Sequence, residues 1–116
     1  MRISEMKTAE EVLAEDLKDP EFREEWERTA PARALASALI AYRIEHDLTQ
    51  SELARRLKMK QSAIARMEMG EHNPRIETLE RLSHTLGINF HIDITPDSPT
   101  TLHLDTGRRP LTASRP

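Results

Sequence analysis

Residues 48–70, LTQSELARRLKMKQSAIARMEMG, carry the signals for two short helices joined by a tight turn. Thr49 and Glu52 have the spacing of a capping box, in which each side chain bonds the backbone N–H of the other residue at a helix start. Apolar residues recur with helical spacing on both sides of residues 58–60, and Gly70 offers a left-handed residue that ends a helix. The stretch therefore predicts a helix-turn-helix.

The second of these helices has the side chains of a DNA-reading surface. In a helix-turn-helix the second helix lies in the major groove, where Gln can pair with adenine, Arg with guanine and Ser with several bases. The outward polar positions near its start are Lys60, Gln61, Ser62 and Arg66. Lys58 falls in the turn, where its charge suits a position near phosphates. We expect a sequence-specific DNA-binding protein.

The segment from about residue 33 to 87 resembles the Xre/Cro family of helix-turn-helix repressors, related to the lambda-type phage repressors. The matching positions are Leu48-Thr49-Gln50, Glu52-Leu53-Ala54, Ile64-Ala65-Arg66-Met67-Glu68 with Gly70, Pro74, Thr78-Leu79 and Leu86-Gly87. The resemblance implies a mainly helical, lambda-repressor-like bundle in which Gln50 braces the DNA backbone. It also implies base or phosphate contacts by Lys60, Gln61, Ser62 and Arg66. Arg43 and Glu68 match a structural pair of the family, whereas Lys58 departs from the family's usual glycine.

Composition sets limits on the function. At 116 residues the chain holds one domain with extensions, and no apolar run is long enough to cross a membrane. The N-terminus lacks the apolar core of a secretory signal, so we expect a cytoplasmic protein. The absence of Cys excludes disulfides and Cys-ligated zinc fingers. The five His residues lack metal-ligand spacing and no phosphate-binding loop is present, so we expect neither an enzyme nor a cofactor.

The charge is divided unevenly along the chain. Residues 1–30 hold five basic and ten acidic residues, whereas residues 31–116 hold twelve basic and ten acidic residues. The positive charge is concentrated in the motif, at Arg55, Arg56, Lys58, Lys60 and Arg66. Because affinity for phosphates depends on local basic charge, the net charge of −3 does not argue against DNA binding. An acidic arm beside a basic module indicates a basic protein partner or screening of the DNA face.

The arm, residues 1–30, predicts two short helices that begin near Thr8 and Asp19. Phe22 and Trp26 lie on one face of the second helix, surrounded by acidic residues that include Glu25. Aromatic anchors within a charged rim are typical of protein interfaces. The same two aromatics could instead pack the arm onto its own domain, and the sequence leaves both interpretations open.

Residues 31–87 form the predicted helix-turn-helix domain, and residues 88–95 alternate apolar and polar side chains as a half-buried strand does. The apolar positions of this strand are Ile88, Phe90, Ile92 and Ile94. No second strand is predicted within the domain, so we expect these residues to pair with the same strand of a second subunit in a homodimer. The alternatives are a strand lying along its own domain or completing a partner's sheet. Residues 96–116 are predicted to be a flexible tail.

The order of arm, helix-turn-helix and strand resembles the HigA-type antitoxins of toxin–antitoxin systems. This resemblance implies a dimer that binds an inverted repeat at its own promoter, represses its operon and neutralises a HigB-like toxin, a ribonuclease of the RelE fold. The arm would supply the toxin contacts, with Phe22, Glu25 and Trp26 as candidates. The alternatives are a stand-alone or prophage Xre-family regulator without a toxin, and an interaction module whose helix-turn-helix is vestigial.

Overall fold

The computed structural model describes residues 7–105, which form six helices and two strands. The helices are α1 (Ala9–Asp16), α2 (Pro20–Arg28), α3 (Ala30–Glu45), α4 (Gln50–Leu57), α5 (Gln61–Glu68) and α6 (Ile76–Leu86). The strands are β1 (Asn89–Asp93) and β2 (Thr101–Asp105). The predicted mainly helical fold with a helix-turn-helix at α4 and α5 is confirmed. None of the helices within residues 7–105 is long and apolar enough to cross a membrane.

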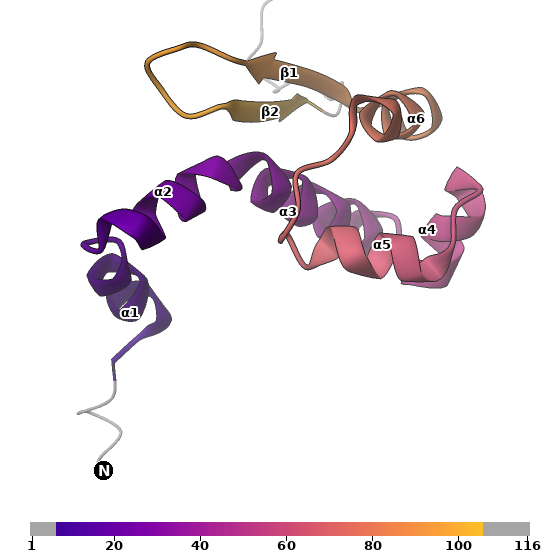
Figure 1. The fold of residues 1–116 in the computed structure, drawn as a ribbon. Coiled ribbons are helices and arrows are strands. Elements are labelled where there is room, and N and C mark those ends of the chain that lie inside the picture. Colours follow the sequence, from indigo (N-terminus) through magenta and orange to yellow (C-terminus); the bar gives the residue numbers. More distant parts are fainter. Residues whose placement is uncertain (1–6, 106–116) are drawn as a thin grey trace, which may run out of the picture.

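The arm consists of α1 and α2, which start as the sequence predicts. The Thr8 hydroxyl accepts a hydrogen bond from the backbone N–H of Glu11, and the Asp19 carboxylate accepts one from that of Glu21. Neither helix contains a buried residue. In Figure 1 both helices lie at one end of the molecule, away from α4 and α5. The arm therefore presents most of its acidic surface to solvent.

The core of the bundle is built by the four helices α3 to α6. Each of them contributes one side chain with no exposed surface: Leu39, Leu53, Ile64 and Leu82. The helical spacing of apolar residues in the sequence thus reflects real packing faces. Because α3 contacts α2, α5 and β2, it is the element against which the other parts of the fold are positioned.

The strand at β1 finds its partner within the same chain. β1 pairs antiparallel with β2, with Phe90 opposite Leu104 and Ile92 opposite Leu102. The expectation that the domain lacks a second strand is therefore wrong, as is the expectation of a flexible tail for residues 101–105. Leu102 is buried and β2 lies against α3. Packing against the bundle therefore orders residues 101–105 as a strand, although their composition is typical of a flexible tail. The tail residues 106–116 lie outside the described residues.

The four apolar positions predicted for a dimer strand have different environments. Ile88 is 1% exposed and lies in the core directly after Gly87, whose left-handed backbone ends α6. Ile88 is thus not available to a second subunit, contrary to expectation. Phe90 is half-buried and packs against the core, whereas Ile92 and Ile94 are exposed.

Candidate nucleic-acid interface

Helix α4 begins with the predicted capping box and ends at the predicted turn before α5. The Thr49 hydroxyl accepts from the backbone N–H of Glu52 at 3.1 Å, and the Glu52 carboxylate accepts from that of Thr49 at 2.9 Å. The hydrogen bond from the Thr49 backbone N–H lowers the pKa of Glu52, because it favours the ionised carboxylate. Lys58 ends α4 in the left-handed conformation, at φ 55°. The lysine therefore occupies the turn with the backbone that a glycine would adopt more cheaply.

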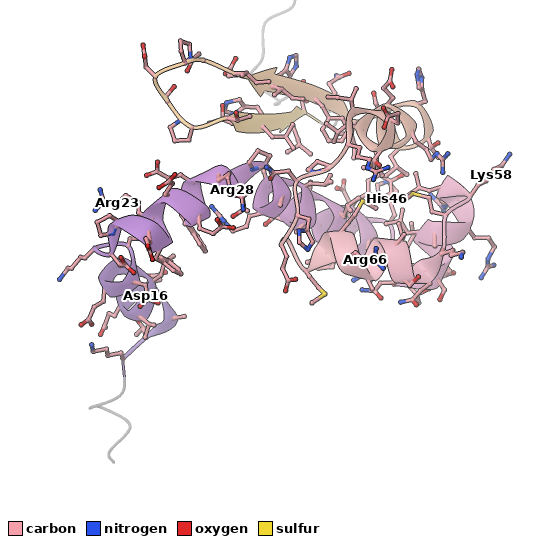
Figure 2. The ribbon with its side chains drawn as sticks, viewed as in Figure 1. Asp16, Arg23, Arg28, His46, Lys58 and Arg66 are labelled. Carbon is pink, nitrogen blue, oxygen red and sulfur yellow. The ribbon has the colours of Figure 1, made fainter. Side chains whose placement is uncertain are left out.

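Helix α5 presents its first turn to solvent. Ile64, fully buried, fixes the helix against the core, and the opposite face is left outside. The exposed residues on and before this face are Lys58, Lys60, Gln61, Ser62 and Arg66. Figure 2 places Lys58 at the turn, with its side chain directed away from the bundle, and Arg66 along α5. These predicted DNA contacts thus lie exposed along α5 and the turn before it.

A chain of side-chain hydrogen bonds connects α3 to the start of α5. The Arg43 guanidinium donates to both carboxylate oxygens of Glu68, at 2.6 and 2.8 Å, which is the pairing implied by the family resemblance. The Gln50 amide donates to Glu68 Oε1 at 3.0 Å, and the Gln61 amide donates to Gln50 Oε1 at 2.6 Å. The first link joins α3 to α5 and the other two join α4 to α5, so Gln61 is connected to α3 through Gln50 and Glu68.

This arrangement leaves Gln61 able to read a base. A glutamine amide has two N–H donors and one carbonyl acceptor, and Gln50 takes only one of the donors. The second N–H and the carbonyl oxygen are the two groups that a bidentate pair with adenine needs. Gln50 itself is half-buried and supports Gln61 through this hydrogen bond. A contact of Gln50 with the DNA backbone stays a prediction.

The charges of the Arg43–Glu68 pair are stabilised together. Burial raises the pKa of Glu68, but hydrogen bonds from Arg43 and Gln50 and the charge of Arg43 outweigh it, so the net pKa is lowered. The hydrogen bond to Glu68 raises the pKa of Arg43 in spite of some desolvation. Both groups are ionised at neutral pH, and the bidentate geometry fixes the end of α5 relative to α3.

One further basic residue beside α5 was missed by sequence reasoning. Arg75 lines a groove of about 330 Å³ together with Arg66, Met59 and Ala63, between α5 and the start of α6. Arg75 caps α6, and its side chain makes no capping hydrogen bond. The positive end of the α6 dipole adds to its charge. The basic face thus extends beyond the two motif helices, a proximity that depends on the path of residues 69–75.

The arm residues proposed for a protein partner are already engaged. The Phe22 and Trp26 rings are stacked with centroids 6.1 Å apart, and the Arg33 guanidinium lies 3.4 Å from the Trp26 ring centroid. Glu25 forms an exposed ion pair with Arg28. Of the two interpretations left open by the sequence, these contacts favour packing of Trp26 onto its own domain. A partner contact through Phe22, Glu25 and Trp26 stays a prediction.

Within residues 7–105, no group of three or more His, Asp or Glu side chains is arranged to hold a metal ion. The chemistry of the exposed α4–α5 surface is that of hydrogen bonding and positive charge, both suited to a nucleic-acid backbone and base edges.

Comparisons with known proteins support the identification of α4 and α5 as a helix-turn-helix. Residues 39–92 match the helix-turn-helix family model. The chain is 31% identical over 91 residues to the antitoxin HigA1 of Mycobacterium tuberculosis, in strains CDC 1551 / Oshkosh and ATCC 25618 / H37Rv. The matched region is 78% of this chain but 60% of each relative, so the chain spans less than two thirds of the length of these relatives. No solved structure matches the chain significantly.

Proposed function

We propose that this chain is a sequence-specific DNA-binding antitoxin of the Xre type, because residues 39–92 match the helix-turn-helix family model and the chain is similar to a HigA antitoxin. In this role it represses its own operon and neutralises a HigB-like ribonuclease toxin. The observation that carries the DNA-binding part is the exposed Gln61 at the start of α5. Gln50 holds the Gln61 amide, and Glu68, paired with Arg43, holds Gln50 in turn. The role is one of binding, and no catalytic step belongs to it.

DNA binding by this surface follows the general geometry of the motif. The first residues of a recognition helix reach the base edges, while cations around it contact phosphates. Gln61, Ser62 and Arg66 are the proposed base-reading residues. Gln50, Lys58 and Lys60 are the proposed backbone contacts.

We also propose that the chain acts as a homodimer on an inverted-repeat operator. The two-stranded sheet leaves each strand with one edge unpaired within the described residues, and such an edge can add a strand from a second subunit. Ile92 and Ile94 remain exposed on the hairpin, while Ile88 and Phe90 support it from the core side.

The antitoxin part of the proposal rests on two observations. The similarity to HigA1 extends over 91 residues and thus beyond the matched domain at 39–92. The arm, moreover, is acidic and solvent-exposed, so it is unsuited to phosphates but suited to a basic protein. A toxin of the HigB type would supply such a basic surface.

Two experiments test the proposal. Footprinting of the DNA upstream of the gene should reveal two half-sites related by a two-fold axis, whereas equal affinity for a scrambled duplex would contradict sequence-specific repression. Co-expression with the adjacent gene should yield a complex with a small basic protein and suppress its toxicity. A neighbour of unrelated type, without toxicity, would favour the alternative of a stand-alone or prophage Xre-family regulator.

A further inference from the structure

We propose that the basic protein partner docks in a groove between the arm and the β-hairpin, named here the arm–hairpin groove. Its lining includes Glu24, Glu27, Asn73, Thr100, Ile92 and Ile94. The inference rests on the proposed function for the existence of the partner, and it assigns the partner a surface other than the Phe22–Trp26 face.

The groove is continuous over three segments that are distant in sequence. A hollow of about 420 Å³ lies between α2, Asn73 and residues 98–100 of the β1–β2 connection. A second hollow of about 160 Å³ shares Asn73 and Thr100 with the first and continues along the hairpin. In Figure 1 the β1–β2 connection extends above α2, where the first hollow is found.

One end of the groove is acidic. Glu24 and Glu27 line the first hollow, and within residues 7–105 their carboxylates form no hydrogen bond or ion pair. Arg28 also lines it, but its charge is balanced by Glu25. Two carboxylates without a balancing cation attract the lysine or arginine side chains of a partner.

The other end of the groove is apolar. Ile76, Ile92 and Ile94 line the second hollow and are 58%, 37% and 77% exposed. A third hollow of about 250 Å³ shares Ile76 and Ile92 and continues past Phe90 along α6. A contiguous exposed apolar surface beside polar residues is characteristic of a binding site. The groove therefore fits a segment with a basic residue followed by aliphatic or aromatic side chains.

The junction at the centre of the groove is held by hydrogen bonds. The Asn73 amide oxygen accepts from the backbone N–H of Ala32 at 3.1 Å, and its nitrogen donates to the carbonyl of Arg28 at 2.9 Å. One side chain thus ties the loop after α5 to the end of α2 and the start of α3. A surface that is already formed binds a partner without the entropic cost of ordering it.

Charge distinguishes a basic partner from a second copy of this chain. The basic residues of the chain are concentrated on α4 and α5, on the surface assigned to DNA. The arm of a second copy would bring acidic residues to the acidic end of the groove, where like charges repel. The groove is thus complementary to a different protein with a positive surface.

The test uses the full chain and the basic protein encoded beside its gene as the probe. Titration calorimetry would compare the wild type with the double variant Glu24→Lys, Glu27→Lys and with Ile76→Ser, at a residue of the apolar end that belongs to neither the DNA surface nor the proposed dimer strand. We expect each groove variant to weaken partner binding at least tenfold, while operator affinity and helical content stay unchanged. The matched control is Glu10→Lys with Glu11→Lys, the same charge change on α1, which we expect to change partner affinity less than twofold.

Three outcomes would overturn the inference. Groove variants that bind the partner as well as the wild type, while Phe22→Ala loses it, would move the partner to the other arm face and leave the proposed function intact. A dimer that becomes a monomer in Ile76→Ser, with unchanged partner affinity, would assign the groove to a second copy. A wild type that binds the operator but not the basic protein would refute the antitoxin role itself, and the docking inference with it.

Discussion

The guanidinium of Arg43 and the carboxylate of Glu68 meet through two hydrogen bonds although the residues are 25 positions apart in sequence. Their side chains are only 21% and 6% exposed. The pair joins α3 to the last turn of α5, and Gln50 extends it to the first turn through Gln61. The same carboxylate thus serves both the stability of the bundle and the position of a proposed base-reading side chain.

We expect Arg43→Ala to lower the free energy of unfolding by about 3 kcal/mol, because it leaves the Glu68 carboxylate in a poorly solvated site without its cation. Urea denaturation followed by circular dichroism measures this loss. Arg28→Ala is the matched control: its ion pair with Glu25 is 63% exposed on both sides, so the loss should be at most about 1 kcal/mol. Equal losses in both variants would contradict a structural role for the Arg43 pair.

Acid should remove the contribution of Glu68. Its pKa is lower in the folded chain than the ordinary value of about 4.3, so the ionised form stabilises the fold above that pH. This stability is lost as the pH falls through the lowered folded pKa. We therefore expect Glu68→Gln to be less stable than the wild type at pH 7 and the difference to shrink in acid. Glu52, whose pKa is also lowered, is present in both proteins, so its contribution cancels in the difference between their free energies of unfolding. A difference independent of pH would contradict the ionic role of Glu68.

Base reading and phosphate contact should separate by mutation. Gln61→Ala is expected to reduce affinity for the operator by about 1–3 kcal/mol and to leave affinity for random DNA nearly unchanged. Lys58→Ala keeps a residue with a side chain in the left-handed turn but removes the charge, so it should weaken binding to every duplex and reduce the salt dependence. Filter-binding titrations on both DNAs measure these effects. Equal losses on operator and random DNA in Gln61→Ala would sink its assigned role.

The two left-handed glycines of the described chain should respond differently to alanine. At Gly87, φ 73°, an added Cβ meets nothing within 4 Å, so Gly87→Ala should cost only the strain of the backbone, about 1 kcal/mol. At Gly70, φ 67°, the Cβ would lie 3.3 Å from Ala36 Cβ and 3.4 Å from Arg33 Cα. Gly70→Ala should therefore be the more destabilising change in thermal denaturation. The reverse order would show that α3 yields easily at this contact.

The proposed dimer should depend on the hairpin. Because Ile92 pairs with Leu102 in the ladder, Ile92→Pro disrupts β1 while the four core helices retain their own packing. We expect a helical monomer with much weaker operator binding, as measured by sedimentation and gel shift. An intact dimer in this variant would refute dimerisation through the hairpin.

The local signals in the sequence were strong where the structure depends on neighbouring residues. The capping box of Thr49 and Glu52, the helix ends at Gly70 and Gly87, and the apolar faces of the motif helices are all decided within a few positions. The family resemblance added the Arg43–Glu68 pair, which no local pattern contains. These features specify a helix-turn-helix by themselves.

The second strand was missed for a physical reason. Residues 101–105 follow a connection rich in Ser, Thr and Pro, and the segment is too short to be persuasive by its alternation alone. What makes it a strand is the burial of Leu102 against α3 and the ladder with β1, and both are contacts over long sequence distances. The same contacts place Ile88 in the core, so the predicted dimer surface was partly misassigned.

The sequence by itself determined that the chain places a polar, basic helix on a helical bundle and carries an acidic arm, because capping, periodicity and charge are properties of short segments. Only the tertiary structure decided which of those side chains are free. It covers Trp26 with Arg33, pairs Glu25 with Arg28, and leaves Glu24, Glu27 and Ile94 lining one groove without a covering partner in the described chain. That selection depends on how α2, Asn73 and the hairpin pack together, and packing between distant segments is not encoded in any one of them.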